Sequence, residues 1–305
     1  MLSIGNFLIQ VYSKKSAAAA GKPECLPNKR PRSPLETFAD TPDDQAAADK
    51  RYYIILYTDF IHNLTLELKK MHYFFYEGLK NTAIEECIKL NKDEAEHLFK
   101  ILRAAPGDQI RLLDGCGTVA DATVIPGKML QIQNMTLFPM PSLRIHVYVA
   151  APRRQKMEQL LKQAAELGAW RIVPIQCERS VALPSGERIA KRGPDLLMEA
   201  CKQSGNAYLP QLEDPIKCMD AIADAKAKCQ KVFFGDPGTS GEPGSLTGDI
   251  GYFIGPEGGF SPTEADAIRQ AGFLPIRIGH WILRVETAVT AGLAVLNFLE
   301  ENTLH

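Results

Sequence analysis

The chain has 305 residues, enough for one large or two moderate domains, and its 45% of hydrophobic residues is ordinary for a soluble globular protein. A formal net charge of −1 at pH 7 provides no field over the whole molecule that would attract nucleic acid, so any RNA binding must come from a local basic surface. Seven cysteines without a CxxC pair argue against a disulfide framework and a zinc site, and no apolar run approaches the ~20 residues of a membrane span.

Residues 1–70 differ in composition from the rest of the chain. The tract 13–50 combines AAAA, PNKRPRSP and TPDDQAAAD, with many prolines and charges and few large apolar side chains. Such a tract cannot bury enough surface to offset its ordering entropy, so we expect 1–70 to be a disordered or separate extension. Its start lacks the basic region and cleavage site of a secretory signal peptide. Together with the unpaired cysteines, this predicts a protein of the reducing cytoplasm.

Residues 71–140 show short strand patterns separated by turn signals. The strands are YFFYEG, QIRLLDG, TVADATVI and MLQIQNMTL, with glycines between them. One helix is expected over 92–102, with Asn91 as its N-cap and Glu94 at the third position. We therefore predict a small antiparallel β-barrel that one helix interrupts.

Residues 141–305 alternate strands with helices. The strand IHVYVAA after Leu143 is followed by a helix with an apolar stripe, the strand RIVPIQ, a helix over 188–204 and the strand KVFFGD. Strands that alternate with helices predict a parallel sheet with helices on both faces.

The most informative stretch is 251–297. The strand GYFI runs into GPEGG, and Ser261 to Glu264 has the pattern of a capping box with proline at the first helical position. A second strand over 273–278 ends at Gly279, and after the loop 280–285 comes a helix over 286–298 that is apolar on nearly every face. Two glycine loops that leave strand ends are where a ligand binds in an open parallel sheet.

The residues of these loops restrict the ligand. Neither a P-loop lysine nor a GxGxxG pattern is present, and the acidic Glu257 between the glycines disfavours phosphate. A plain turn without a ligand explains GPEGG equally well. The second loop favours a site, because Arg284 and Glu286 lie close to Gly279 among apolar residues.

The motifs IGPEGGFSPTE and IGHWILRVETA, within a span of about 71–299, resemble the ribosomal RNA small-subunit methyltransferase E family of the SPOUT class. The resemblance implies a C-terminal α/β-knot domain over 141–305, a PUA-like barrel over 71–140, and S-adenosylmethionine-dependent methylation of uridine N3 in 16S ribosomal RNA. It also implies a homodimer without a metal, with the last helix in the interface through Val289, Leu293 and Leu296. Burial under the chain's own sheet explains those three residues too. The chain departs from the family pattern at His280 and Trp281, where we expect Pro-Arg, and at Asn206.

The chemistry assigns candidate roles. Methylation of uridine N3 needs the N–H proton removed and the developing anion stabilised, so Arg284 is the candidate anion stabiliser and Glu286 the candidate base. A salt bridge, or a charge placed at a helix N-terminus, explains Glu286 as well. RNA contacts are expected at Arg103, Arg153 and Arg179. Simple exposure of these side chains to solvent explains the three arginines equally well. The residues expected to bind the cofactor are Phe234, Gly235, Gly255, Pro256, Glu257, Gly258, Gly259, Ile278, Gly279, Ile282 and Leu283.

Two other functions fit the sequence. One is a SPOUT methyltransferase that acts on another RNA, such as a transfer RNA ribose, and the other is a non-catalytic RNA-binding protein that kept the fold. The sequence identifies neither the methylated nucleotide nor the assembly state of the RNA.

Overall fold

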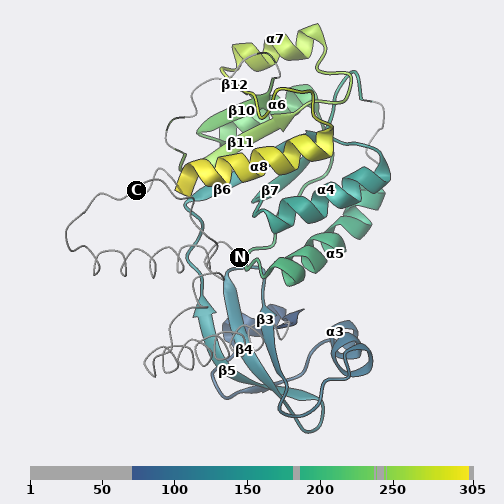
Figure 1. Cartoon of the computed structure of the whole chain (residues 1–305), viewed down its shortest axis with the longest axis vertical. Helices are drawn as coiled ribbons and strands as arrows, with labels where there is room; N and C mark the ends of the chain where they lie inside the picture. Colours follow the sequence, from purple (N-terminus) through teal and green to yellow (C-terminus); the bar gives the residue numbers. More distant parts are fainter. Residues whose placement is uncertain (1–70, 181–185, 237, 239–243, 245, 302–305) are drawn as a thin grey trace, which may run out of the picture. The chain divides into compact units, whose positions relative to one another are not determined.

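The computed structural model describes residues 71–180, 186–236, 238, 244 and 246–301 (Figure 1). The extension predicted for 1–70 lies outside these residues. In the described part of the chain, no helix combines the length and the hydropathy that crossing a bilayer requires.

The first part of the described chain is a five-stranded sheet in the order β1-β3-β4-β5-β2. Its strands are β1 (Tyr73–Phe75), β2 (Cys87–Ile88), β3 (Gln109–Leu113), β4 (Thr118–Ile125) and β5 (Met129–Leu137). The pairs are antiparallel except that β1 runs parallel to β3, which the strand patterns did not predict. Every second residue of β4 is buried, as expected for a sheet that curls around a core on one face.

The predicted helix over 92–102 is present in a modified form. It begins as α3 (Lys92–Glu96) and continues as one π-helical turn, His97–Ile101. The predicted cap is confirmed, because the Asn91 side chain accepts a hydrogen bond from the Glu94 backbone N–H. Leu98 on this helix packs with Phe74, Leu112 and Leu130 in the core of the barrel.

The second part is a seven-stranded sheet whose main order is β12-β10-β11-β6-β7-β8, with β9 also paired to β7. Every pair in it is parallel, as predicted. The strands are β6 (Leu143–Ala150), β7 (Arg171–Gln176), β8 (Gln211–Leu212), β9 (Ile216–Lys217), β10 (Lys231–Gly235), β11 (Gly248–Ile254) and β12 (Leu274–Ile276).

Helices cover both faces of the parallel sheet (Figure 1). One face packs against α4 (Arg154–Glu166), α5 (Gly186–Ser204) and α8 (Val285–Glu301), and the other against α6 (Cys218–Lys228) and α7 (Pro262–Gln270). Neighbouring residues of the central strands therefore belong to different cores: Val147 faces α8 and Tyr148 faces α6. Burial on both sides explains why these strands are continuous apolar runs.

The last helix packs against its own sheet. Val289, Leu293 and Leu296 are fully buried within the single chain, so their predicted place in a dimer interface is wrong and the alternative of burial under the sheet is confirmed. Gly292 permits this approach, because a Cβ there would overlap the ring of Tyr252. The Tyr252 hydroxyl donates to the Ala288 carbonyl at 3.0 Å and fixes α8 against β11.

A buried histidine lies on β6. His146 is 6% exposed, and its Nε2 is 2.9 Å from Asp249 Oδ1 on β11. Among the described residues, its Nδ1 has no hydrogen-bond partner. Burial lowers the pKa of His146 below its usual value; Asp249 opposes this shift, whereas Arg171 on β7 and Lys228 on α6 add to it. The folded protein therefore holds this imidazole neutral.

This arrangement predicts an acid-sensitive fold. The unfolded chain takes up a proton at His146 near pH 6.5 and the folded chain does so only at lower pH, so the free energy of unfolding should fall as pH drops below about 6.5. Urea denaturation at a series of pH values should show this slope, and His146→Gln should flatten it. His280→Gln, at an exposed position, serves as the control. An identical slope in His146→Gln would contradict the assignment.

Candidate functional site

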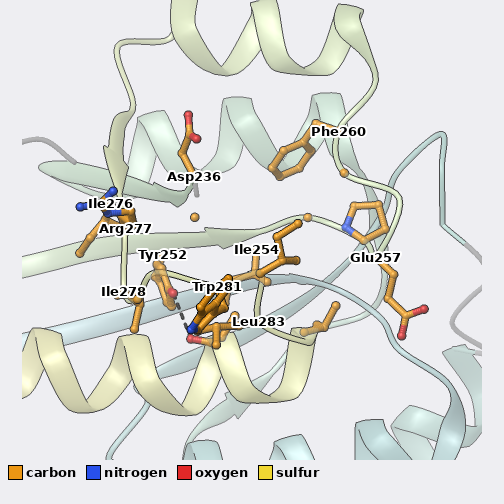
Figure 2. A pocket seen from close by; sticks show the side chains of 18 of the residues that line it. Asp236, Tyr252, Ile254, Glu257, Phe260, Ile276, Arg277, Ile278, Trp281 and Leu283 are labelled. Carbon is orange, nitrogen blue, oxygen red and sulfur yellow. Dashed lines mark hydrogen bonds between the residues drawn. The ribbon is translucent and has the colours of Figure 1, made fainter. Parts of the chain in front are cut away.

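A pocket of about 340 Å³ lies at the carboxyl ends of β10, β11 and β12 (Figure 2). Three segments form most of it: the end of β10 at Gly235 and Asp236, the end of β11 with the loop 255–260, and the stretch from the end of β12 through residue 285 into the first turn of α8. Its volume is in the range of small-molecule sites, roughly 300–1,000 Å³. The carboxyl edge of a parallel sheet is also where such folds bind ligands.

Three glycines of the loop 255–259 occupy positions where a side chain would be crowded or the backbone is left-handed. A Cβ at Gly255 would come within 3.0 Å of the Phe260 ring, and one at Gly258 within 3.4 Å of Arg179. Gly259 has φ of +70°, the left-handed region that favours glycine, and its N–H donates to the Pro256 carbonyl. The loop thus presents backbone groups to the pocket.

Glu264 joins this loop to the end of β7. The predicted capping box is confirmed: Ser261 accepts from the Glu264 N–H, and Glu264 Oε2 accepts from the Ser261 N–H at 2.9 Å. Its other oxygen, Oε1, accepts from the Glu178 N–H at 2.9 Å. Arg179 adds hydrogen bonds to the carbonyls of Gly258 and Phe260. The glycine loop is therefore fixed to the β7 end by two adjacent residues.

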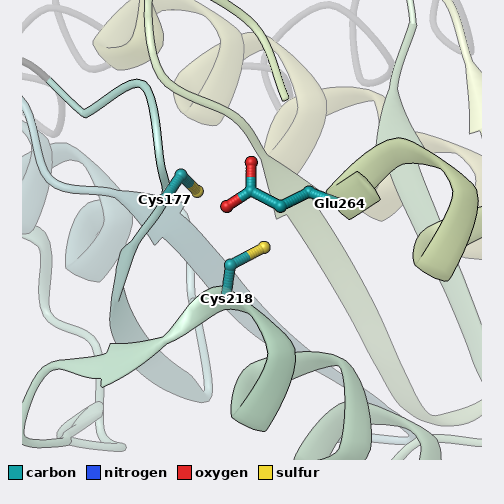
Figure 3. A group of neighbouring side chains, drawn as sticks. All are labelled: Cys177, Cys218 and Glu264. Carbon is teal, nitrogen blue, oxygen red and sulfur yellow. The ribbon is translucent and has the colours of Figure 1, made fainter. Parts of the chain in front are cut away.

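Two buried thiols lie beside this carboxylate (Figure 3). The Sγ atoms of Cys177 and Cys218 and a carboxylate oxygen of Glu264 are all within 4.8 Å of one another. A hydrogen bond with Cys218, together with burial, raises the pKa of the Cys177 thiol. A metal site would need thiolates. We assign the group a packing role, because both Glu264 oxygens already accept backbone N–H groups and the raised pKa of Cys177 disfavours its thiolate.

Replacing Glu264 by glutamine should therefore loosen the loop. A glutamine side chain has one acceptor oxygen, so one of the two N–H groups loses its partner, at a cost of about 1–3 kcal/mol in the free energy of unfolding. Urea denaturation measures the loss. Asp266→Asn on the exposed face of the same helix is the control and should change stability little. Equal stability of the two variants would show that the two hydrogen bonds to the Glu264 carboxylate contribute little to stability.

The two candidate catalytic residues lie beside the pocket at the start of α8. Arg284 is exposed, and its carbonyl accepts from the Ala288 N–H. Glu286 is 6% exposed, and its carboxylate is 2.6 Å from Lys156 Nζ on α4. Burial, the largest single influence, would raise the pKa of Glu286, but the hydrogen bond from Lys156, a backbone hydrogen bond and the charges of Lys156 and Arg284 together lower it. The predicted salt-bridge alternative for Glu286 is thus present, and its role as a base stays a prediction.

The structure brings most of the predicted cofactor residues together. All of them line the pocket except Phe234, which is buried within β10. The sequence analysis did not include several lining residues, although two of them lie near strand ends. Asp236 directly follows the last residue of β10, and Arg277 lies next to the last position of the strand predicted over 273–278. The lining residues that were not predicted are Asp236, Tyr252, Ile254, Phe260, Ile276, Arg277, Trp281, Val285 and Ala288.

The three candidate RNA-binding arginines are all exposed, in different places. Arg153 precedes α4 and lines a small cleft that Pro256 and Glu257 also line, and Arg179 contacts the glycine loop from the β7 end. Arg103, with φ of +55°, follows the π-helical turn of the barrel. Two of the three therefore flank the same loop.

Comparisons with known proteins agree with this geometry. A family model described as an RNA methyltransferase domain matches residues 139–297, and one described as an RNA methyltransferase PUA domain matches 90–131. The ribosomal RNA small subunit methyltransferase E of Synechocystis sp. is 28% identical over 232 residues, which are 72% of this chain and 75% of that protein.

Two solved structures are similar over their whole length. The enzyme of the same name from Neisseria gonorrhoeae, bound to S-adenosylmethionine, is 26% identical with a TM-score of 0.67, and the match covers 75% of this chain and 98% of that one. A Legionella pneumophila methyltransferase with bound S-adenosylmethionine is 27% identical with a TM-score of 0.67, over 75% and 97% of the two chains. The predicted fold class, a SPOUT-type α/β domain preceded by a PUA-like barrel, is confirmed.

Proposed function

This chain belongs to the RNA methyltransferase family, and from that premise we propose that it transfers the methyl group of S-adenosylmethionine to N3 of a uridine in 16S ribosomal RNA. The observation that carries the proposal is the pocket that the two glycine-containing loops form at the carboxyl edge of the sheet. It occurs in a chain that matches two solved structures containing S-adenosylmethionine over most of its length.

The residues of the pocket suit that cofactor. Tyr252, Ile254 and Leu283 give apolar walls, and the backbone of the two loops offers hydrogen-bonding groups for an adenine edge. Asp236 and Glu257 add acidic side chains that complement the positive sulfonium and amino groups. A Cβ at Gly279 would meet no protein atom within 4 Å, so free space adjoins this glycine of the lining.

The cofactor supplies an electrophilic methyl group, and the side chains beside the pocket must prepare the acceptor. Loss of the N3 proton places negative charge on the uracil ring and its two oxygens, and we assign its stabilisation to the exposed guanidinium of Arg284. Glu286 is the candidate that we assign to accept the proton, although its ion pair with Lys156 makes it a weaker base. We therefore assign more of the catalysis to Arg284 than to Glu286.

The RNA itself would be held by arginines on both parts of the chain. Arg153 and Arg179 flank the glycine loop, and Arg103 lies on the barrel that matches the PUA model. Arginines suit this role because the guanidinium binds phosphate oxygens in pairs. We propose 16S ribosomal RNA or the small ribosomal subunit as the partner, and the cytoplasm, where that subunit is assembled, as the compartment.

The test is modification mapping of 16S RNA from a strain that lacks the gene. The proposal predicts the loss of one N3-methylated uridine, and purified protein with S-adenosylmethionine should restore it. Loss of a transfer RNA ribose methyl group would instead support the other SPOUT function. Cofactor binding without any missing modification in RNA would refute the proposal.

We also propose that the protein is a homodimer in which the outer face of α8 takes part. Val289, Leu293 and Leu296 are buried in the chain's own core, whereas Ala294 and Phe298 on the same helix are exposed. Sedimentation velocity should show a dimer at micromolar concentration, and Phe298→Asp should shift it towards the monomer, because an unpaired carboxylate would be placed in the interface. A monomeric wild-type protein would contradict the proposal.

A further inference from the structure

Two large apolar side chains stand in solvent at the pocket. Trp281 is 84% exposed and Ile282 is 86% exposed, yet both belong to the lining. Trp281 is labelled in Figure 2. Their neighbours in the same loop turn inward: Leu283 is half-buried and Val285 is 4% exposed. The fold does not need the indole, since it contributes almost nothing to the core.

Exposed arginines lie on both sides of Trp281 in the sequence. Arg277 lines the pocket from the start of the same loop and is exposed, and Arg284, at the end of the loop, is exposed too. Surfaces that bind single-stranded nucleic acid combine cationic side chains for the backbone with aromatic rings on which bases stack. An exposed aromatic beside arginines, at the mouth of a cofactor-sized pocket, matches that combination.

We propose that Trp281 is the platform on which the acceptor base stacks, and hence a positioning residue for the RNA substrate. The inference rests on the proposed function. Stacking uses the π-face of the base and leaves its ring edge free. For a uracil that edge carries N3 between O2 and O4, so the contact can hold the ring while N3 faces the pocket. Indole offers the largest aromatic face among the side chains, at the cost of ordering only two dihedral angles.

The chain contains a second tryptophan, which makes a direct test straightforward. Trp170 packs against Tyr208, with ring centroids 5.6 Å apart, so Trp170→Phe should keep the fold and leave Trp281 as the sole indole. An oligouridylate of about ten nucleotides, within the site sizes of such surfaces, is the probe. We expect saturable quenching of the Trp281 emission on titration, because a stacked base quenches the indole.

The variants separate stacking from general apolar contact. In the wild-type background, Trp281→Leu should weaken oligouridylate binding by roughly 10- to 100-fold and raise the KM for 16S RNA more than it lowers kcat. Trp281→Phe should retain most of the affinity, because it keeps a π-face. Met219→Ala, at an exposed apolar side chain of α6, is the matched control and should behave as wild type. Equal affinity of Trp281→Leu and wild type would overturn the inference.

One further outcome would also decide against it. If a second copy of the chain covers Trp281, the emission of free protein will be blue-shifted and will change on dilution, while oligouridylate leaves it unaffected. Failure of the proposed function is distinct, because it appears as an absence of S-adenosylmethionine binding in wild-type protein. RNA binding that is weakened in Trp281→Leu when S-adenosylmethionine is saturating supports the platform.

Discussion

Arg284→Ala is expected to lower the single-turnover rate of methyl transfer by roughly 10² to 10³, the usual loss when one donor to a developing anion is removed. The affinity for S-adenosylmethionine should stay within a few-fold of the wild-type value. Arg284 is exposed directly before α8, and the lining of the pocket consists of other residues, so the substitution should leave that lining unchanged. Rates measured with saturating cofactor and excess enzyme isolate the chemical step.

Arg284→Lys should have a methyl-transfer rate between those of Arg284→Ala and the wild type. A guanidinium presents a fixed plane of donors, whereas an ammonium is a point charge without that geometry. Arg269→Ala, at an exposed arginine of α7 that pairs with Asp266, is the matched control and should transfer methyl groups normally. Wild-type rates in Arg284→Ala would remove this arginine from the mechanism.

Gly279→Val is expected to reduce the affinity for S-adenosylmethionine by at least about 100-fold, which corresponds to roughly 2.7 kcal/mol. Gly279 lines the pocket, has no positive φ, and a Cβ there would meet no protein atom within 4 Å. The new side chain should therefore enter space that the ligand needs without disturbing the fold.

The unliganded stability of this variant supplies its control. The melting temperature of Gly279→Val without cofactor should equal that of wild type, and Ala227→Val on the exposed face of α6 should change neither stability nor binding. A lowered melting temperature would indicate that the loss of binding comes from misfolding. Unchanged affinity would place the cofactor elsewhere.

Local signals in the sequence predicted the parts of the fold that neighbouring residues determine. The cap at Ser261 and Glu264 and the cap at Asn91 involve residues three positions apart, so their patterns identified both helix starts. The alternation of strands and helices predicted the parallel sheet in the same way. The boundary between the two parts, placed after residue 140, stays a prediction.

Local signals could not predict contacts between residues that are far apart along the sequence. Lys156 pairs with Glu286 across 130 positions, and Glu178 donates to Glu264 across 86. The all-round apolar pattern of α8 was compatible with a dimer interface or with the chain's own core, and only the packing of Leu293 against the sheet decides between them. The sequence marked Trp281 only as a departure from the family pattern, because the exposure of a side chain is a property of the fold.

The central claim is that the pocket between the two glycine loops binds S-adenosylmethionine. Isothermal titration calorimetry of the wild-type protein with S-adenosylmethionine, and separately with ATP, tests it most directly. The account predicts saturable binding of S-adenosylmethionine at one site per chain, loss of that heat in Gly279→Val, and no response to ATP. Binding of ATP with no response to S-adenosylmethionine would contradict the account.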